Sequence, residues 1–149
     1  IAGMRGFYAD QLERLIHALK LDDHVTLTGW IPREDLYDLY VRADAFLYPS
    51  TFEGFGLPVL EALAAGVPTA CSNIEPLRSI AGEAALQFHP EEEDQIRDAM
   101  LRLVGDEDLR RRLVAAGPET AKKFSWERTA SLTRSFLIET ALYRSRSSS

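Results

Sequence analysis

Residues 45–71 read AFLYPSTFEGFGLPVLEALAAGVPTAC, and their pattern gives the clearest indication of the fold class. It begins with four consecutive apolar residues, a run typical of a strand buried on both faces of a parallel sheet. Pro49, Gly54 and Gly56 follow, and they cannot continue such a strand, because proline lacks a donor for the ladder and glycine has no side chain to pack. The chain therefore leaves the strand for a loop at its carboxyl end.

A helix is predicted to begin at Leu57. Pro58 suits the first helical turn, where its missing N–H would have had no partner, and Leu57 and Leu60 fall on one face. Gly66 ends this helix, and residues 67–71 form the next predicted strand. Strand, glycine loop, helix and strand make up a βαβ unit.

The loop of this unit is a candidate binding site, because ligands of βαβ units bind at the carboxyl end of the strand. The start of a helix presents unpaired N–H groups and a partial positive charge, and glycines let a phosphate approach the backbone closely. We therefore predict that Gly54, Phe55, Gly56 and Leu57 hold a diphosphate.

Two carboxylates, Glu53 and Glu61, bracket the loop. A carboxylate repels phosphate, but it accepts paired hydrogen bonds from a vicinal diol or stabilises a developing positive charge. A ribose on one side of the diphosphate and a sugar on the other would satisfy both groups. The alternative is that Glu61 is only a helix carboxylate and Glu53 only a loop residue that accepts from backbone N–H groups.

The motif PS-x-x-EGFGLPVLEALAAGVP resembles the signature of retaining GT-B glycosyltransferases of family GT4, in which it lies in the C-terminal, nucleotide-sugar-binding domain. The resemblance extends from Ile1 to about Trp126 through IAG, TGWIPREDLYDLY, SNIEPLRSIAGEAALQFHP and FSWE. One departure is that Glu75-Pro76 and Arg78-Ser79 replace the commoner Gly-Gly and Pro-Glu pairs. The SNI-x-x-L version resembles a subset with many mannosyl- and related hexosyltransferases.

The resemblance implies a three-layer, Rossmann-like α/β domain, with about five parallel strands and helices on both faces, as one half of a GT-B architecture. It implies transfer of a hexose from a UDP- or GDP-sugar with retention, and it places Glu53 at the reacting end as the catalytic residue. Glu61 then binds the donor at its ribose. No obligatory metal and no further cofactor is implied.

The resemblance also implies that the chain begins inside a longer protein. We expect residues 1–143 to be a nucleotide-sugar-binding domain that lacks its first strands, followed by a disordered tail at residues 144–149. A missing N-terminal acceptor-binding domain, and the basic residues that assist the diphosphate, would lie upstream. We therefore expect the complete protein to be an active retaining glycosyltransferase and this chain alone to be inactive.

Composition agrees with one soluble domain. The chain has 149 residues, 46% hydrophobic and 27% charged, with a net charge of -6, which argues against nucleic acid as a partner. A single cysteine excludes an internal disulfide and fits a reducing compartment. No apolar run approaches 18 residues, so we expect a cytoplasmic protein.

Two turns before the central stretch carry further candidates. Arg5, in a loop that follows the strand end at residues 1–3, is the nearest cation for a phosphate, unless this loop is only a solvated turn. A short strand is predicted at residues 25–28, and Trp30 and Ile31, which follow it, could line the pocket for a base. The alternative for Trp30 is packing at the sheet edge.

The rest of the chain alternates helices and one strand. Helices are predicted at residues 8–21, from Pro32, and at residues 77–81, 92–104, 107–120 and 126–143, with a strand at residues 85–88. Asp106 and Ser125 are predicted caps of the last two helices. The basic run Arg110–Arg112 is either a solvated face or a contact for an anionic membrane. In the second case the protein would associate peripherally with the membrane.

Other classes of protein fit less well. A response-regulator receiver domain needs acidic residues after its first and third strands and a lysine after its fifth, and the corresponding positions here hold none of them. Another GT-B protein, such as a phosphorylase, a sugar-nucleotide epimerase or a non-catalytic nucleotide binder, stays open as an alternative.

Overall fold

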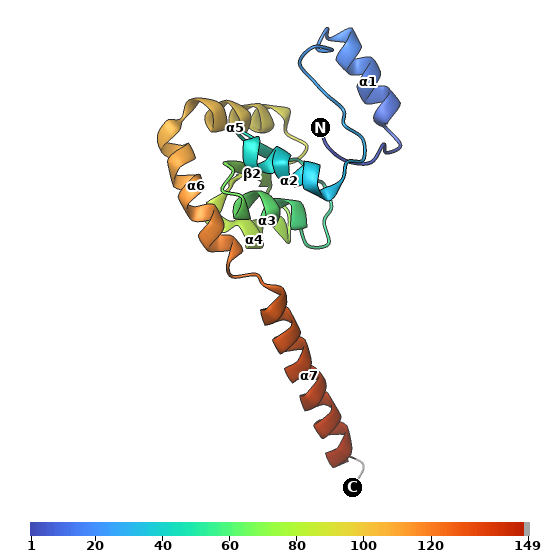
Figure 1. Ribbon diagram of the computed structural model, residues 1–149, viewed down its shortest axis with the longest axis vertical. Coiled ribbons are helices and arrows are strands. Elements are labelled where there is room, and N and C mark those ends of the chain that lie inside the picture. The colour runs from blue at the N-terminus through green and yellow to red at the C-terminus, as the bar shows by residue number, and fades with distance from the viewer. Residues whose placement is uncertain (148–149) are drawn as a thin grey trace. The chain divides into compact units, whose positions relative to one another are not determined.

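The computed structural model describes residues 1–147. It divides into two compact parts, Ile1–Arg42 and the chain from Ala43 onward, and Figure 1 shows their elements in chain order.

The second part contains a parallel sheet in the order β1-β2-β3. Its strands are β1 (Phe46–Tyr48), β2 (Thr69–Ser72) and β3 (Leu86–Phe88). Leu47 pairs with Ala70, and Ala70 pairs with Leu86, so the three predicted strands are parallel neighbours as expected. The predicted number of about five strands is wrong for the described residues, which form a three-stranded sheet.

Helices lie on both faces of this sheet. They are α3 (Leu57–Ala64), α4 (Leu77–Ala81), the 3₁₀ turn η1 (Gly82–Ala84), α5 (Glu93–Gly105) and α6 (Glu107–Ala121). A further helix, α7 (Trp126–Ser147), follows α6 and extends away from the sheet (Figure 1). Adjacent residues of β2 point to opposite sides: Cys71 packs with residues of α3 and α4, and Ala70 packs with residues of α5 and α6. The fold is therefore the predicted three-layer α/β arrangement.

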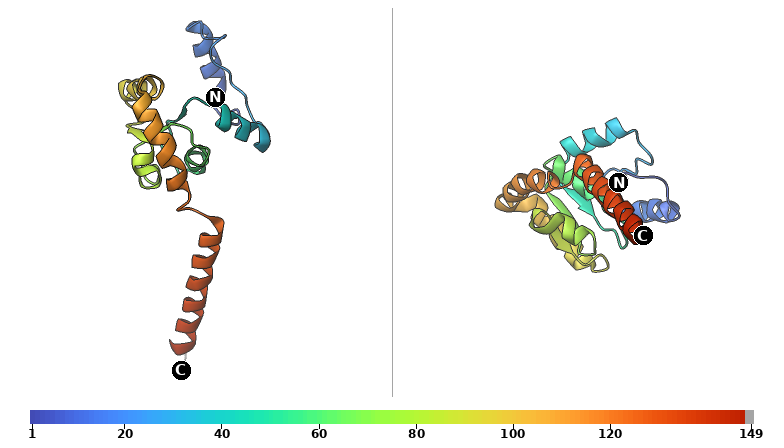
Figure 2. Two further views of the ribbon diagram at one scale, coloured as in Figure 1. Left: turned by 60° about the vertical axis from the view of Figure 1, so that its left-hand side comes forward. Right: turned by 90° about the horizontal axis from the view of Figure 1, so that it is seen from below.

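Helices α3 and α6 pack closely against each other (Figures 1 and 2). Gly117 of α6 makes this possible, because a Cβ atom there would lie 2.8 Å from the carbonyl oxygen of Leu63 in α3. Asp106 caps α6 as predicted, with its Oδ1 accepting from the N–H of Leu109 at 2.9 Å. This contact and this cap fix the path of α6 across the α3 face.

Ser125 caps α7 as predicted, since its hydroxyl accepts from the N–H of Arg128 at 3.1 Å. The helix continues to Ser147, past the end expected at Tyr143 and through four residues assigned to a tail. The last two residues of that tail, 148–149, lie outside the described residues. Every α7 side chain that the structure describes is exposed.

The first part holds α1 (Ala9–Ala18) and α2 (Arg33–Arg42). The strand predicted at residues 25–28 is wrong: one isolated parallel bridge, Ala2 to Gly29, takes its place. The N–H of Gly3 donates to the carbonyl of Gly29 at 3.2 Å, and the N–H of Thr28 donates to that of Ile1 at 3.0 Å. Pairing with residues 1–3 amounts to an isolated bridge instead of a ladder, so residues 25–28 do not form a strand.

Candidate functional site

The loop between β1 and α3 leads directly into the first turn of a helix. Val59 and Leu60 donate to the carbonyl of Gly56 at 3.1 and 3.3 Å, which closes the first turn of α3. The N–H groups of residues 54–57 make no hydrogen bond within the described part of the chain. Four unpaired donors therefore precede or open a helix, where the partial charge is positive.

Gly56 is required in this turn for two reasons. Its φ is +99°, in the left-handed region that favours glycine. A Cβ atom at this position would also overlap the Cδ2 atom of Leu77, a fully buried residue at the start of α4. The loop after β1 and the turn after β2 are therefore packed directly against each other.

Glu53 lies in this loop, half-buried. The hydroxyl of Tyr48, the last residue of β1, donates to Glu53 Oε1 at 2.5 Å. Burial first, and then the bond to the Glu53 carboxylate, raise the pKa of Tyr48 to about 12. Sequence reasoning missed Tyr48, although its hydroxyl sets it apart in an otherwise apolar strand.

Glu61 lies in the second turn of α3 and is the one charged residue of this helix. Its side chain is half-buried, whereas the neighbouring Leu60 and Ala62 are buried. Glu53, residues 54–57 and Glu61 thus occupy one continuous segment at the carboxyl end of β1. These predicted residues are thus contiguous in the chain, and their contacts with a donor stay predictions.

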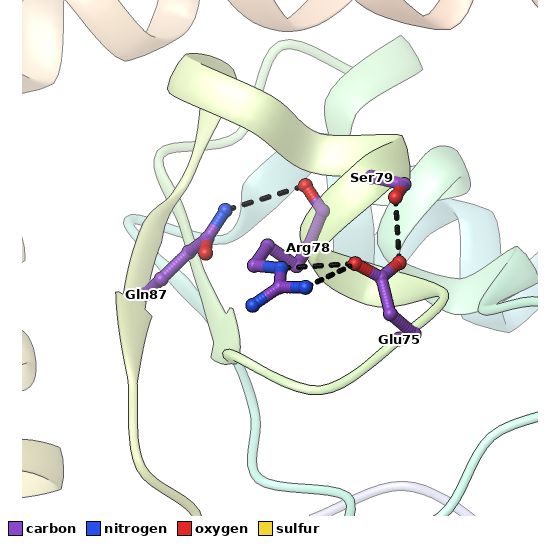
Figure 3. A network of polar contacts seen from close by, with 4 residues as sticks. All are labelled: Glu75, Arg78, Ser79 and Gln87. Atoms are coloured by element: carbon purple, nitrogen blue, oxygen red, sulfur yellow. Dashed lines mark hydrogen bonds and ion pairs between the residues drawn. The ribbon is translucent and has the colours of Figure 1, made fainter.

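The turn after β2 carries a polar network that Figure 3 shows. Glu75 accepts from Arg78 Nε at 2.9 Å and from Ser79 Oγ at 2.6 Å. These bonds, Ser79 first and then Arg78, lower the pKa of Glu75. Gln87 of β3 donates to the carbonyl of Gly82 at 3.1 Å and ties the end of α4 to the sheet. Arg78 therefore already has a carboxylate partner and faces solvent.

Arg5, Trp30 and Ile31 belong to the first part of the chain. Arg5 binds Glu13 at 2.8 Å and Asp10 at 3.1 Å, and these hydrogen bonds, to Glu13 first, raise its pKa. Trp30 is 71% exposed, so the alternative of a packed sheet-edge residue does not hold in this structure, and Ile31 is half-buried. Their contacts with a base or phosphate stay predictions.

The basic run of α6 is not a uniform solvated face. Arg110 donates to the carbonyls of Leu103 at 2.7 Å and Asp44 at 2.8 Å, and it is only 28% exposed. Arg111 pairs with Asp108 on its own helix. Two of the three arginines thus have structural partners.

Residues 1–147 contain no helix with the length and apolar character needed to cross a bilayer. Within the same range, no three His, Cys, Asp or Glu side chains gather in a way that could hold a metal ion.

A parallel sheet between helices, with a glycine loop that opens a helix at the end of a strand, defines the Rossmann-like class of α/β domains. The family described as "Glycosyl transferases group 1" matches residues 1–120. The chain belongs to this family, and its fold is that of the GT-B glycosyltransferases.

Relatives agree with this assignment. O-antigen chain mannosyltransferase B of Escherichia coli is 39% identical over 133 residues, which are 89% of this chain and 35% of that protein. The serotype-specific mannosyltransferase WbdA of the same organism is 36% identical over 127 residues, 83% of this chain and 16% of that protein. The chain therefore spans about a third or less of these curated relatives.

Among solved structures, the sucrose-phosphate synthase from Thermosynechococcus elongatus superposes with a TM-score of 0.78 at 30% identity. The match covers 90% of this chain and 35% of that one. Sequence and structure comparisons thus confirm the family resemblance and the α/β Rossmann-like fold.

Proposed function

We propose that this chain binds the nucleotide diphosphate sugar donor within a retaining glycosyltransferase that transfers a hexose to a glycan, lipid or other acceptor. One observation carries the proposal: four unbonded N–H groups at residues 54–57 lie between the carboxylates of Glu53 and Glu61. A donor of this kind has a diphosphate between two diols, which is the complementary arrangement.

The diphosphate is the part of the donor that the loop itself would bind. Backbone N–H groups at a helix start stabilise phosphate oxygens without a side-chain cation. The loop contains no lysine or arginine, so full affinity would need the basic residues proposed upstream, in the longer protein with its N-terminal acceptor-binding domain. Arg5 is proposed as an additional phosphate contact.

The two carboxylates would recognise the two sugars. Glu61, one turn into α3, is proposed to accept hydrogen bonds from the ribose, which is present in every nucleotide donor. Glu53, in the loop, is proposed to face the transferred hexose and the charge that develops at its anomeric carbon. Trp30 and Ile31 are proposed contacts of the base.

The donor base and hexose are open within the UDP- and GDP-sugars. Because both relatives named above are mannosyltransferases, a mannose donor is the first to test. A cytoplasmic location and a peripheral contact with an anionic membrane are also proposals. Arg112 would carry any such contact, since Arg110 and Arg111 are engaged within the protein.

The test is calorimetric titration of the longer protein with a nucleoside diphosphate and with the corresponding nucleotide sugar. We expect Glu61→Ala to weaken both ligands by about 1.5–3 kcal/mol, the range for a hydrogen bond to a charged acceptor. Glu53→Ala should leave the bare nucleotide unchanged and lower kcat more than ground-state binding.

Glu83→Ala is the matched control, because Glu83 is an exposed glutamate in η1, before β3 and so away from the carboxyl end of the sheet. It should change neither affinity nor turnover. Equal losses for both ligands in both Glu53→Ala and Glu61→Ala would refute the assignment of the two carboxylates. Retention is tested by the anomeric configuration of the product.

A further inference from the structure

The Glu53 side chain has one hydrogen-bond partner among the described residues, and that partner is Tyr48. The phenol donates to Oε1 at 2.5 Å, in a half-buried position where solvent competes less for the bond. A glutamate on a loop otherwise samples several rotamers. The orientation of this carboxylate therefore depends on a residue of the strand.

Tyr48 is itself held firmly. Its ring stacks on Phe46 with 5.9 Å between centroids and 15° between planes. It pairs with Cys71 in the sheet register, and its carbonyl accepts from Ser72 Oγ at 3.4 Å. A donor fixed to a paired strand positions a loop carboxylate more accurately than another loop residue would.

We propose that Tyr48 is a positioning residue that fixes the Glu53 carboxylate toward the transferred sugar. The phenol occupies Oε1 and leaves Oε2 as the oxygen that accepts from the sugar or faces its developing charge. This inference rests on the proposed function and adds a residue that the signature motif does not contain.

The protonation state of Tyr48 suits this role. Because its pKa is about 12, the phenol keeps its proton across the physiological range and can only donate to the carboxylate. A phenylalanine would preserve the stacking on Phe46 but would remove the donor. Tyr48→Phe therefore changes the orientation of Glu53 with little change in the packing of the strand.

The experiment measures steady-state kinetics of the Tyr48→Phe variant of the longer protein, together with calorimetric titration by the nucleoside diphosphate. A carboxylate misplaced by about 1 Å can reduce turnover by about 10²-fold, so we expect kcat to fall roughly 10- to 100-fold. The donor KM should stay within about twofold, and affinity for the bare nucleotide should not change.

Tyr37→Phe is the matched control. Tyr37 also uses its hydroxyl in a side-chain bond, accepting from Arg33 Nε at 2.5 Å, but it is an exposed residue of α2. It should leave kcat unchanged. An unchanged kcat in Tyr48→Phe overturns the inference, and so does a parallel loss of nucleotide affinity, which would show that Tyr48 only supports the fold of the loop.

A double-mutant cycle with Glu53→Gln separates this inference from the proposed function. If Tyr48 acts through Glu53, the double variant should turn over no more slowly than Glu53→Gln alone. Additive losses overturn the inference while leaving donor binding intact. If the unmodified protein neither binds nor turns over any nucleotide sugar, the proposed function fails and the inference falls with it. Thermal unfolding of the unmodified protein, Tyr48→Phe, Glu53→Gln and the double variant then shows whether the hydrogen bond itself exists.

Discussion

Residues 1–42 and the sheet-containing part of the chain have similar apolar patterns, yet only the second part builds a core. In residues 1–42 the buried hydrophobic side chains are Ile16 and Tyr40, whereas Leu15 and Leu19 of the same apolar stripe are more than half exposed. In α3, Leu60 and Leu63 are both buried.

The difference lies in the partner available to each helix. The paired strands β1, β2 and β3 form a surface on which α3 and α6 bury their apolar faces. In residues 1–42 a single bridge replaces the predicted strand, so no sheet surface forms there. Amphipathic periodicity thus predicts the helix correctly, but burial requires a neighbouring element.

A pair of leucine truncations tests this comparison with the largest expected effect. Leu63 is fully buried and Leu15 is 53% exposed. Leu63→Ala should reduce the free energy of unfolding by about 2–5 kcal/mol, since it leaves a cavity, and Leu15→Ala by less than about 1 kcal/mol. Denaturant titration of both variants is the measurement. Equal losses would show that residues 1–42 have a core of comparable density.

The close approach of α6 to α3 gives a smaller effect. In Gly117→Ala the new methyl group would lie 2.8 Å from a backbone oxygen, which cannot move as a side chain can. We expect a loss of about 1–3 kcal/mol from overpacking, even though alanine gains about 1 kcal/mol in helix propensity.

Gly105→Ala is the control for that gain, because no atom lies within 4 Å of a Cβ atom at this position in α5. Gly105→Ala should be neutral or stabilising when it and Gly117→Ala are each compared with the unmodified protein by thermal unfolding. If Gly117→Ala were as stable as Gly105→Ala, the packing of α6 on α3 would be looser than the structure indicates.

Removing an exposed charge should have the smallest effect on stability, and this effect should be similar in the two parts of the chain. The pKa of Glu75 lies below its usual value of 4.5, so its carboxylate stabilises the folded state above that pH, and this stabilisation disappears as pH falls through the lower folded-state value. Glu75→Gln should therefore melt slightly below the unmodified protein at pH 7, and this difference should shrink as the pH falls below 4.5.

Asp10→Asn, which removes one partner of Arg5, provides the comparison in residues 1–42. Its effect on the melting temperature at pH 7 should be equally small, because both ion pairs are solvent-exposed. A melting-temperature difference for Glu75→Gln that grows as the pH falls would contradict the sign argued here.

Local signals predicted much of the packed part. Helix α4 has the predicted bounds at both ends, Gly66 ends α3 in the left-handed conformation, and Asp106 and Ser125 cap their helices. Each of these features depends on residues within a few positions of one another, which is why sequence reasoning succeeds there.

Features that depend on distant partners were missed. The β-branched residues 25–28 indicate a strand, but their pattern cannot show whether another segment pairs with them along their length, and in this structure one isolated bridge forms. From the sequence alone, Gly117 is a residue of low helix propensity, and its role becomes clear only from the close contact with α3. The Ser- and Arg-rich end of the chain is a separate case: its composition indicated a tail, whereas α7, whose described side chains are all exposed, continues to Ser147.

In the candidate site, too, residues that are adjacent in sequence could be predicted, whereas a contact formed by the fold could not. Glu53, residues 54–57 and Glu61 are contiguous in sequence, so the βαβ pattern was sufficient to group them. Tyr48 was read as part of an apolar strand, because only the turn of the loop brings Glu53 back to its hydroxyl.

Amide NMR can show whether the backbone of residues 54–57 binds a diphosphate. Isotope-labelled chain would be titrated with UDP and GDP, and the ¹H–¹⁵N signals followed even if binding is weak. We predict that the amide signals of Gly54, Phe55, Gly56 and Leu57 show the largest shifts, because their N–H groups have no hydrogen-bond partner among the described residues and would donate to phosphate. If these four signals stay in place while others move, the diphosphate binds elsewhere and residues 54–57 are not its binding site.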